Sequence, residues 1–139
     1  MASADELRTQ IDQGHETLKA VFEGADASKW EQVPDGDEEW NARQMAEHVI
    51  GSELGIAGGV ANTMMGKAPE RPELALASPA EAMTALEAAV EASNKVTRYV
   101  EDRDLEKPVG ENGGTIESML ALLGSHATDH ASQIGSATS

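Results

Sequence analysis

Two of the four histidines in this chain lie four residues apart, His126 and His130, in the run H-A-T-D-H. An α-helix turns by about 100° per residue, so this separation places both side chains on one face with Cβ atoms about 6 Å apart. Met119, Leu123 and Ile134 share that face, and we expect the pair to point into an apolar core. Two neutral imidazoles at this spacing can bind one divalent metal ion.

A third histidine, His48, is the expected partner of this pair and comes from a different helix. Ser52, Gly55 and Gly59 lie on the same side of that helix, and we expect these small residues to leave room beside the ring. Three imidazoles leave at least one position of a tetrahedral or octahedral site open, which is typical of catalytic metals. A water or thiol bound there would have its pKa lowered. The sequence therefore predicts a metal site on His48 and the pair.

Other interpretations of the histidines stay open at this point. A single inward-facing histidine is more often a hydrogen-bonded core residue than a ligand, and only the three together favour a metal. His15 lies at the edge of the first helix's apolar stripe, where it can line a pocket or mark the boundary of the core. Gln133 lies near the face of the pair and can line a pocket. Glu47 and Glu53 point away from His48 by helical angle, so neither is an expected ligand.

Four helices are expected to position these residues. Capping signals precede each one, because a Ser, Asn or Thr side chain can accept a hydrogen bond from the first free amides of a helix. Proline at the first helical position strengthens the third start. The expected caps are Ser3, Asn41, Ser78 and Thr115, and the expected helices run over residues 4–22, 42–65, 79–101 and 116–134.

The predicted fold is an all-α four-helix bundle in a single domain, residues 1–139. Apolar residues make up 40% of the chain but aromatic residues only 3%, so the core must be built from Ala, Leu, Val, Ile and Met, which favours helices over sheets. Antiparallel neighbours are the simplest arrangement. Two of the connections are long enough to permit a crossover instead.

The charge balance excludes several partners. With 25 acidic and 10 basic residues the formal net charge is −15, and there is no Lys/Arg cluster, so nucleic acid is not an expected partner. Anionic membrane surfaces are disfavoured for the same reason, and no apolar run approaches the roughly 20 residues of a membrane helix. The absence of cysteine excludes disulfides, thiolate metal sites and Cys nucleophiles. We expect a soluble cytoplasmic protein.

Two stretches carry a resemblance to a known family. The first is W-N-A-R-Q-M-A-E-H-V, residues 40–49, in which a Trp and a polar cap open a helix and a histidine follows two turns later. The second is H-A-T-D-H-A-S-Q-I, residues 126–134, a histidine pair followed by Gln and an apolar residue. In order and separation these stretches resemble the signatures of the DinB-like family of metal-dependent enzymes.

The resemblance implies a four-helix bundle, often a homodimer, with a nickel, zinc or similar divalent ion on His48, His126 and His130. Better-understood relatives are similar to transferases and isomerases that use a low-molecular-weight thiol such as mycothiol, bacillithiol or glutathione. Many relatives have a further histidine and a basic residue after the last ligand, where this chain has Ala131 and Ser132. An acidic thiol would therefore find few basic partners here.

Three functions follow as hypotheses. The first is a metal-dependent enzyme acting on a small-molecule substrate, either a thiol S-transferase or a hydrolase, with Trp40 bracing the mouth of its pocket. The second is a non-catalytic bundle that binds a metal or a small ligand, since no general base stands in a fixed relation to the site. The third is an interaction domain with buried histidines and no metal.

Overall fold

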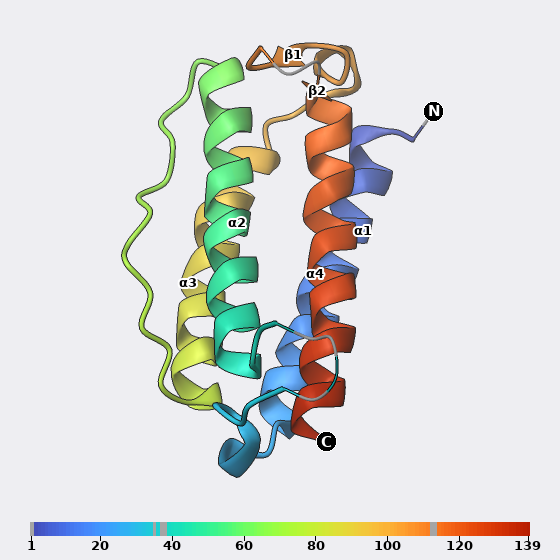
Figure 1. Ribbon diagram of the computed structural model, residues 1–139. Helices are drawn as coiled ribbons and strands as arrows, with labels where there is room; N and C mark the ends of the chain where they lie inside the picture. Colours follow the sequence, from blue (N-terminus) through green and yellow to red (C-terminus); the bar gives the residue numbers. More distant parts are fainter. Residues whose placement is uncertain (1, 35, 37–38, 112–113) are drawn as a thin grey trace.

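The computed structural model describes residues 2–34, 36, 39–111 and 114–139. Figure 1 shows four long helices packed side by side, which confirms the predicted all-α bundle. None of the helices in the described part of the chain combines the length and apolar character needed to cross a membrane. The elements are α1 (Ala4–Gly24), the 3₁₀ turn η1 (Ala27–Lys29), α2 (Ala42–Thr63), α3 (Pro79–Thr97), the 3₁₀ turn η2 (Asp102–Asp104), the short strands β1 (Pro108–Val109) and β2 (Gly114–Thr115), and α4 (Ile116–Thr138).

The helix starts are those that the capping signals predict. The side chains of Ser3, Asn41, Ser78 and Thr115 each accept a hydrogen bond from the amide three residues further on. Each cap therefore satisfies one amide that has no partner within its helix. The starts of α2 and α4, which carry the three candidate ligands, are fixed by complete capping boxes.

The helix ends differ more from expectation. Helix α3 ends at Thr97 rather than near residue 101, because the guanidinium of Arg8 on α1 donates hydrogen bonds to the carbonyls of Thr97 and Val100 at 3.1 and 2.6 Å. Val100 is buried, although it lies in the turn that follows the helix and not in the helix itself. Helix α4 continues to Thr138, past the expected residue 134.

The helices form a crossover bundle, which the long connections permit, and not the simpler all-antiparallel arrangement. In Figure 1, α1 and α4 run in one direction and α2 and α3 in the other. The connection between α2 and α3, residues 64–78, returns along the outside of α2 before α3 begins. The connection packs closely on α2 because three glycines of the helix carry no side chain there. Ideal Cβ atoms at Gly51, Gly55 and Gly58 would lie within 4.0 Å of Leu74, Arg71 and Ala68, respectively.

Leu76, near the end of this connection, is held at the first turns of α2. Its carbonyl accepts a hydrogen bond of 2.7 Å from the buried indole of Trp30, and its amide donates one of 2.9 Å to the carboxylate of Glu47. Trp30 also packs edge-on against Phe22 at the end of α1. These contacts join α1, α2 and the connection at the end of the bundle where α2 begins.

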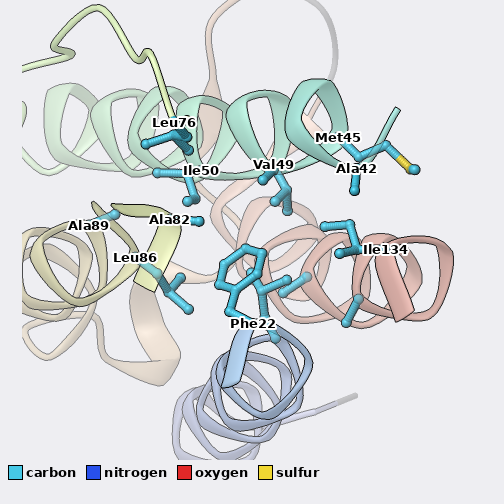
Figure 2. Packing of buried hydrophobic residues seen from close by; sticks show 14 of the residues in the cluster. Phe22, Ala42, Met45, Val49, Ile50, Leu76, Ala82, Leu86, Ala89 and Ile134 are labelled. Carbon is cyan, nitrogen blue, oxygen red and sulfur yellow. The ribbon is translucent and has the colours of Figure 1, made fainter. Parts of the chain in front are cut away.

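The core fills the space enclosed by all four helices. Helix α1 packs on α4, α4 on α2, α2 on α3 and α3 on α1, so α1 and α2 face each other diagonally. Figure 2 shows side chains from each helix meeting at the centre, among them Phe22, Val49, Leu86 and Ile134. A second cluster, which includes Leu7, Val60 and Leu120, fills the other end.

Candidate metal centre

The structure brings His48 of α2 together with His126 and His130 of α4. One ring nitrogen from each lies within 4.8 Å of the other two. The Nε2 atoms of His126 and His130 are 3.0 Å apart, and the ring of His48 is centred 5.1 and 5.0 Å from theirs. Three imidazoles from two antiparallel helices therefore converge on one point. His126 and His130 lie on one face of α4, as their four-residue spacing predicts.

The rings are half-buried rather than part of the core. The buried stripe of α4 passes through Leu123, Ala127, Ala131 and Ile134, so the histidine pair flanks it instead of lying on it. The expectation that the pair points into the apolar core is right only in part. Small residues explain the difference, because Ala127 and Ala131 occupy the inward positions and let α4 pack closely against its neighbours.

Gln133 orients the ring of His130. Its Oε1 lies 2.7 Å from Nδ1 of His130, and an amide oxygen can only accept, so Nδ1 carries the proton. The other nitrogen, Nε2, then has a free lone pair directed toward His126 and the point of convergence. A hydrogen bond of this kind on the far side of a ring is the usual support of a metal-ligating histidine.

Trp40 stands beside His48 at the entrance to the cluster. Its indole is centred 4.9 Å from the His48 ring, at an interplanar angle of 55°, and it is 40% exposed. A pocket of about 420 Å³ opens next to it, and Gln133 forms part of the opposite wall. The pocket therefore adjoins the histidines through the two residues that contact His48 and His130. Its other walls include Lys29, Asn41, Met45, Ser132 and Ser136.

The electrostatics of the cluster favour neutral imidazoles. Burial lowers the pKa of His48 below its ordinary value of 6.5, and the charge of His130 acts in the same direction. Burial likewise lowers the pKa of His126, reinforced by His130 and His48 and opposed by the carboxylates of Asp129 and Glu53. Neutral imidazoles offer lone pairs, so the donors are ready for a cation near neutral pH.

Neither acidic residue that the sequence sets aside joins the donor group. The Glu47 carboxylate faces the connection, where it accepts hydrogen bonds from Leu76 and Arg43. Glu53 is buried elsewhere in the bundle. Within the described ranges, the group that could hold a metal contains the three histidines alone. Such a donor set leaves coordination positions for other ligands.

Two of the small residues near His48 contact other segments of the chain and do not leave open space beside the His48 ring. An ideal Cβ on Gly55 would lie 3.1 Å from the guanidinium of Arg71, and one on Gly59 would lie 3.1 Å from Val109 of β1. Both glycines therefore allow other segments to pack closely on α2. The expectation that they leave room beside the His48 ring is wrong, because the α2–α3 connection and the hairpin cover that part of the helix.

A second polar group, which was not predicted from the sequence, lies deeper in the bundle. His15 of α1, Glu53 of α2 and Ser93 of α3 are buried, and the Glu53 carboxylate is hydrogen-bonded to both of the other side chains. His15 follows Ile11 by four residues and precedes Leu18 by three, so it lies on the apolar stripe itself. A titratable residue on such a stripe is the signal that can reveal a buried polar network from sequence alone.

Comparison with protein families gives a match over most of the chain. The family profile of the DinB superfamily matches residues 10–134, a span that includes all three convergent histidines and most of each long helix. Searches of curated proteins and of solved structures gave no significant match.

Proposed function

Because this chain belongs to the DinB superfamily, we propose that it is a divalent-metal-dependent enzyme that acts on a small molecule. One observation carries the proposal: three imidazoles converge with their donor atoms within 4.8 Å, and no further His or carboxylate joins them among the described residues. Structural metal sites are closed by four protein ligands, whereas catalytic sites keep a position free for reactants.

His48, His126 and His130 would hold the ion. Their fit is supported by the Gln133 hydrogen bond, which directs a lone pair of His130 inward, and by the burial that keeps His48 and His126 neutral. When bound, such an ion supplies Lewis-acid chemistry and lowers the pKa of a coordinated water or thiol. The protein's own contribution is to fix the three donors and to shield one side of them with Trp40.

The pocket beside Trp40 and Gln133 is the proposed substrate site. Its volume, about 420 Å³, falls within the range typical of small-molecule pockets. The walls mix an indole face and aliphatic groups with neutral hydroxyl and amide groups, and Lys29 is the one cation among the described residues that line it. A compact, largely neutral substrate with one anionic group would match this lining.

Two reaction classes fit, thiol S-transfer and hydrolysis. In the first, the sulfur of a low-molecular-weight thiol bonds to an electrophilic carbon, the leaving group departs with its electron pair, and the thiol proton passes to solvent. In the second, water takes the place of the thiol. The scarcity of cations around the pocket argues against a thiol with several carboxylates.

Activity measurements separate these possibilities. The zinc- or nickel-loaded protein is incubated with electrophiles in the presence and absence of a panel of thiols, and then with esters and amides. Turnover that needs a thiol and stops on adding a chelator supports the transferase, and chelator-sensitive turnover in water alone supports the hydrolase. If the protein binds about one ion per chain but turns over none of these substrates, the non-catalytic metal-binding bundle replaces the enzyme.

A further inference from the structure

The buried network of His15, Glu53 and Ser93 joins three helices. Nε2 of His15 is hydrogen-bonded to Oε1 of Glu53, and Oγ of Ser93 donates to the same oxygen at 3.2 Å. Both donors use Oε1, which leaves Oε2 without a donor among the residues that the structure describes. His15 and Glu53 are only 6% and 7% exposed.

A contribution to the stability of the fold does not explain why this buried network is present. Taking a carboxylate and an imidazole out of water costs free energy that their mutual attraction often does not recover, and apolar residues of similar volume commonly stabilise such positions as well or better. Nδ1 of His15 is also buried without a hydrogen-bond partner among the described residues, which adds to the cost. The arrangement therefore suggests a role for the carboxylate beyond packing.

A small cavity connects this network to the candidate metal centre. Its volume is about 10 Å³, and its lining includes His15, Glu53 and the candidate ligand His126, together with apolar side chains from all four helices. This volume is close to that needed for one water, and a buried water needs two to four polar partners. The three polar side chains of the lining can provide them.

His126 lacks the direct support that its neighbour has. Gln133 accepts from Nδ1 of His130, whereas the hydrogen bonds of the described residues give His126 only the contact between its Nε2 and that of His130. Since Nε2 faces the point of convergence, Nδ1 is the atom left for a supporting partner. Glu53 lines the same cavity as His126.

We propose that one water in this cavity joins Oε2 of Glu53 to Nδ1 of His126, which makes Glu53 a positioning residue for the metal centre. The carboxylate accepts from the water, and the water accepts from Nδ1–H of His126. This chain of hydrogen bonds holds the tautomer whose Nε2 lone pair faces the other two histidines. His15 and Ser93 in turn hold Glu53 by occupying Oε1. The inference rests on the proposed metal site for its purpose, but the hydrogen bonds can be tested without metal.

The substitution Glu53→Gln reverses the direction of the hydrogen bonds that run from this residue through the water to His126. The amide oxygen stays with the donors of His15 and Ser93, so the NH₂ group faces the cavity and donates to the water. The water then donates to Nδ1 of His126 and favours the tautomer with the proton on Nε2, which has no lone pair facing the other two histidines. The control is Glu47→Gln, the same change on the same helix, at a carboxylate that faces Leu76 and Arg43.

The test combines two measurements. In ¹⁵N NMR of the metal-free protein, His126 is expected to carry its proton on Nδ1 in the wild type and in Glu47→Gln, and mainly on Nε2 in Glu53→Gln. The zinc Kd of Glu53→Gln is expected to rise by about 10- to 100-fold, with that of Glu47→Gln unchanged. Identical His126 tautomers in wild type and Glu53→Gln would overturn the inference, whether or not the protein binds metal.

A crystal structure of the metal-free wild type provides a check that needs no variant. It is expected to show a water within hydrogen-bonding distance of both Oε2 of Glu53 and Nδ1 of His126. A cavity without that water, or a His126 ring whose Nδ1 points away from it, contradicts the proposal. If the wild type binds no zinc but the water and the tautomer shift are found, the proposed function fails while the positioning network stands.

Discussion

Gln133 holds the ring of His130 from the side opposite the other two histidines. Replacing it with Ala removes the acceptor that keeps the proton on Nδ1, so both tautomers become available and the ring gains freedom. We expect the zinc Kd of Gln133→Ala to rise about 10- to 100-fold, with little change in thermal stability, because Gln133 is exposed. Isothermal titration calorimetry measures the affinity.

Ser132→Ala is the matched control for this change. Ser132 is the preceding residue on α4 and lines the same pocket, and none of the hydrogen bonds described involves its side chain. Its zinc Kd should equal that of the wild type. Equal affinity in Gln133→Ala and Ser132→Ala would mean that the amide does not orient His130.

The lowered pKa of His48 has a consequence for the metal-free protein. The unfolded chain takes up a proton at this residue near pH 6.5, and the folded chain does so only at lower pH. Below pH 6.5 the unfolded state therefore binds more protons, so the free energy of unfolding falls as the pH falls. Urea unfolding measures the free energy of unfolding at neutral and at mildly acidic pH. Between these two pH values, that free energy should fall less in His48→Gln than in the wild type. An equal loss in both proteins would contradict the assigned shift.

Helical geometry predicted that His126 and His130 share one face, because a separation of four residues fixes the direction of two side chains on any helix. His48 was expected as their partner from a different helix, which the spacing of the pair does not determine. The support of each ring was harder to predict. Gln133 was placed near the pocket but not on His130, since that contact depends on rotamers. Glu53 was set aside as a ligand, and its link to His15 was not predicted because it depends on how α1 and α2 face each other across the core.

Two glycines set the distance between α1 and α4. An ideal Cβ on Gly14 would lie 2.7 Å from the backbone oxygen of Gly124, closer than real atoms approach. Gly14→Ala should therefore push apart the two helices, one of which carries His126 and His130, and lower the free energy of unfolding by about 1–3 kcal/mol despite the better helix propensity of Ala. Chemical denaturation measures this loss.

Gly135→Ala is the control for this substitution, because the nearest atom to its ideal Cβ is a Val21 methyl at 3.7 Å, an ordinary contact. Here only the gain in helix propensity remains, roughly 0.5–1 kcal/mol of added stability. Stabilisation by both substitutions would show that α1 and α4 are not in close backbone contact at Gly14.

The sequence predicted the helix starts better than the helix ends. A start depends on a local side chain, such as Thr115 or Asn41, that bonds to its own helix. The end of α3 depends instead on Arg8, almost ninety residues earlier in the chain, and on the turn that buries Val100. The direction of α3 was likewise left open, because it depends on whether the long connection returns along α2. Gly55, one of the glycines that permit this return, was assigned to the pocket.

The whole molecule carries a formal net charge of −15 on 139 residues. Its ion pairs, such as Arg8–Asp5 and Lys95–Glu91, are mostly exposed and contribute little to stability, so repulsion among the remaining carboxylates is the larger effect. Raising the ionic strength shortens the Debye length to about 10 Å at 0.1 M and screens that repulsion. We therefore expect the Tm to rise with added sodium chloride. A Tm that falls would show that the ion pairs outweigh the repulsion.

The metal content of the purified protein after equilibrium dialysis against zinc or nickel tests whether the three histidines form a metal centre. We expect about one ion per chain in the wild type and in Asp129→Asn, a change on the same helix outside the donor group, and close to none in folded His126→Ala. A wild type without bound metal, or a His126→Ala variant that retains its full content, would contradict a centre built on His48, His126 and His130.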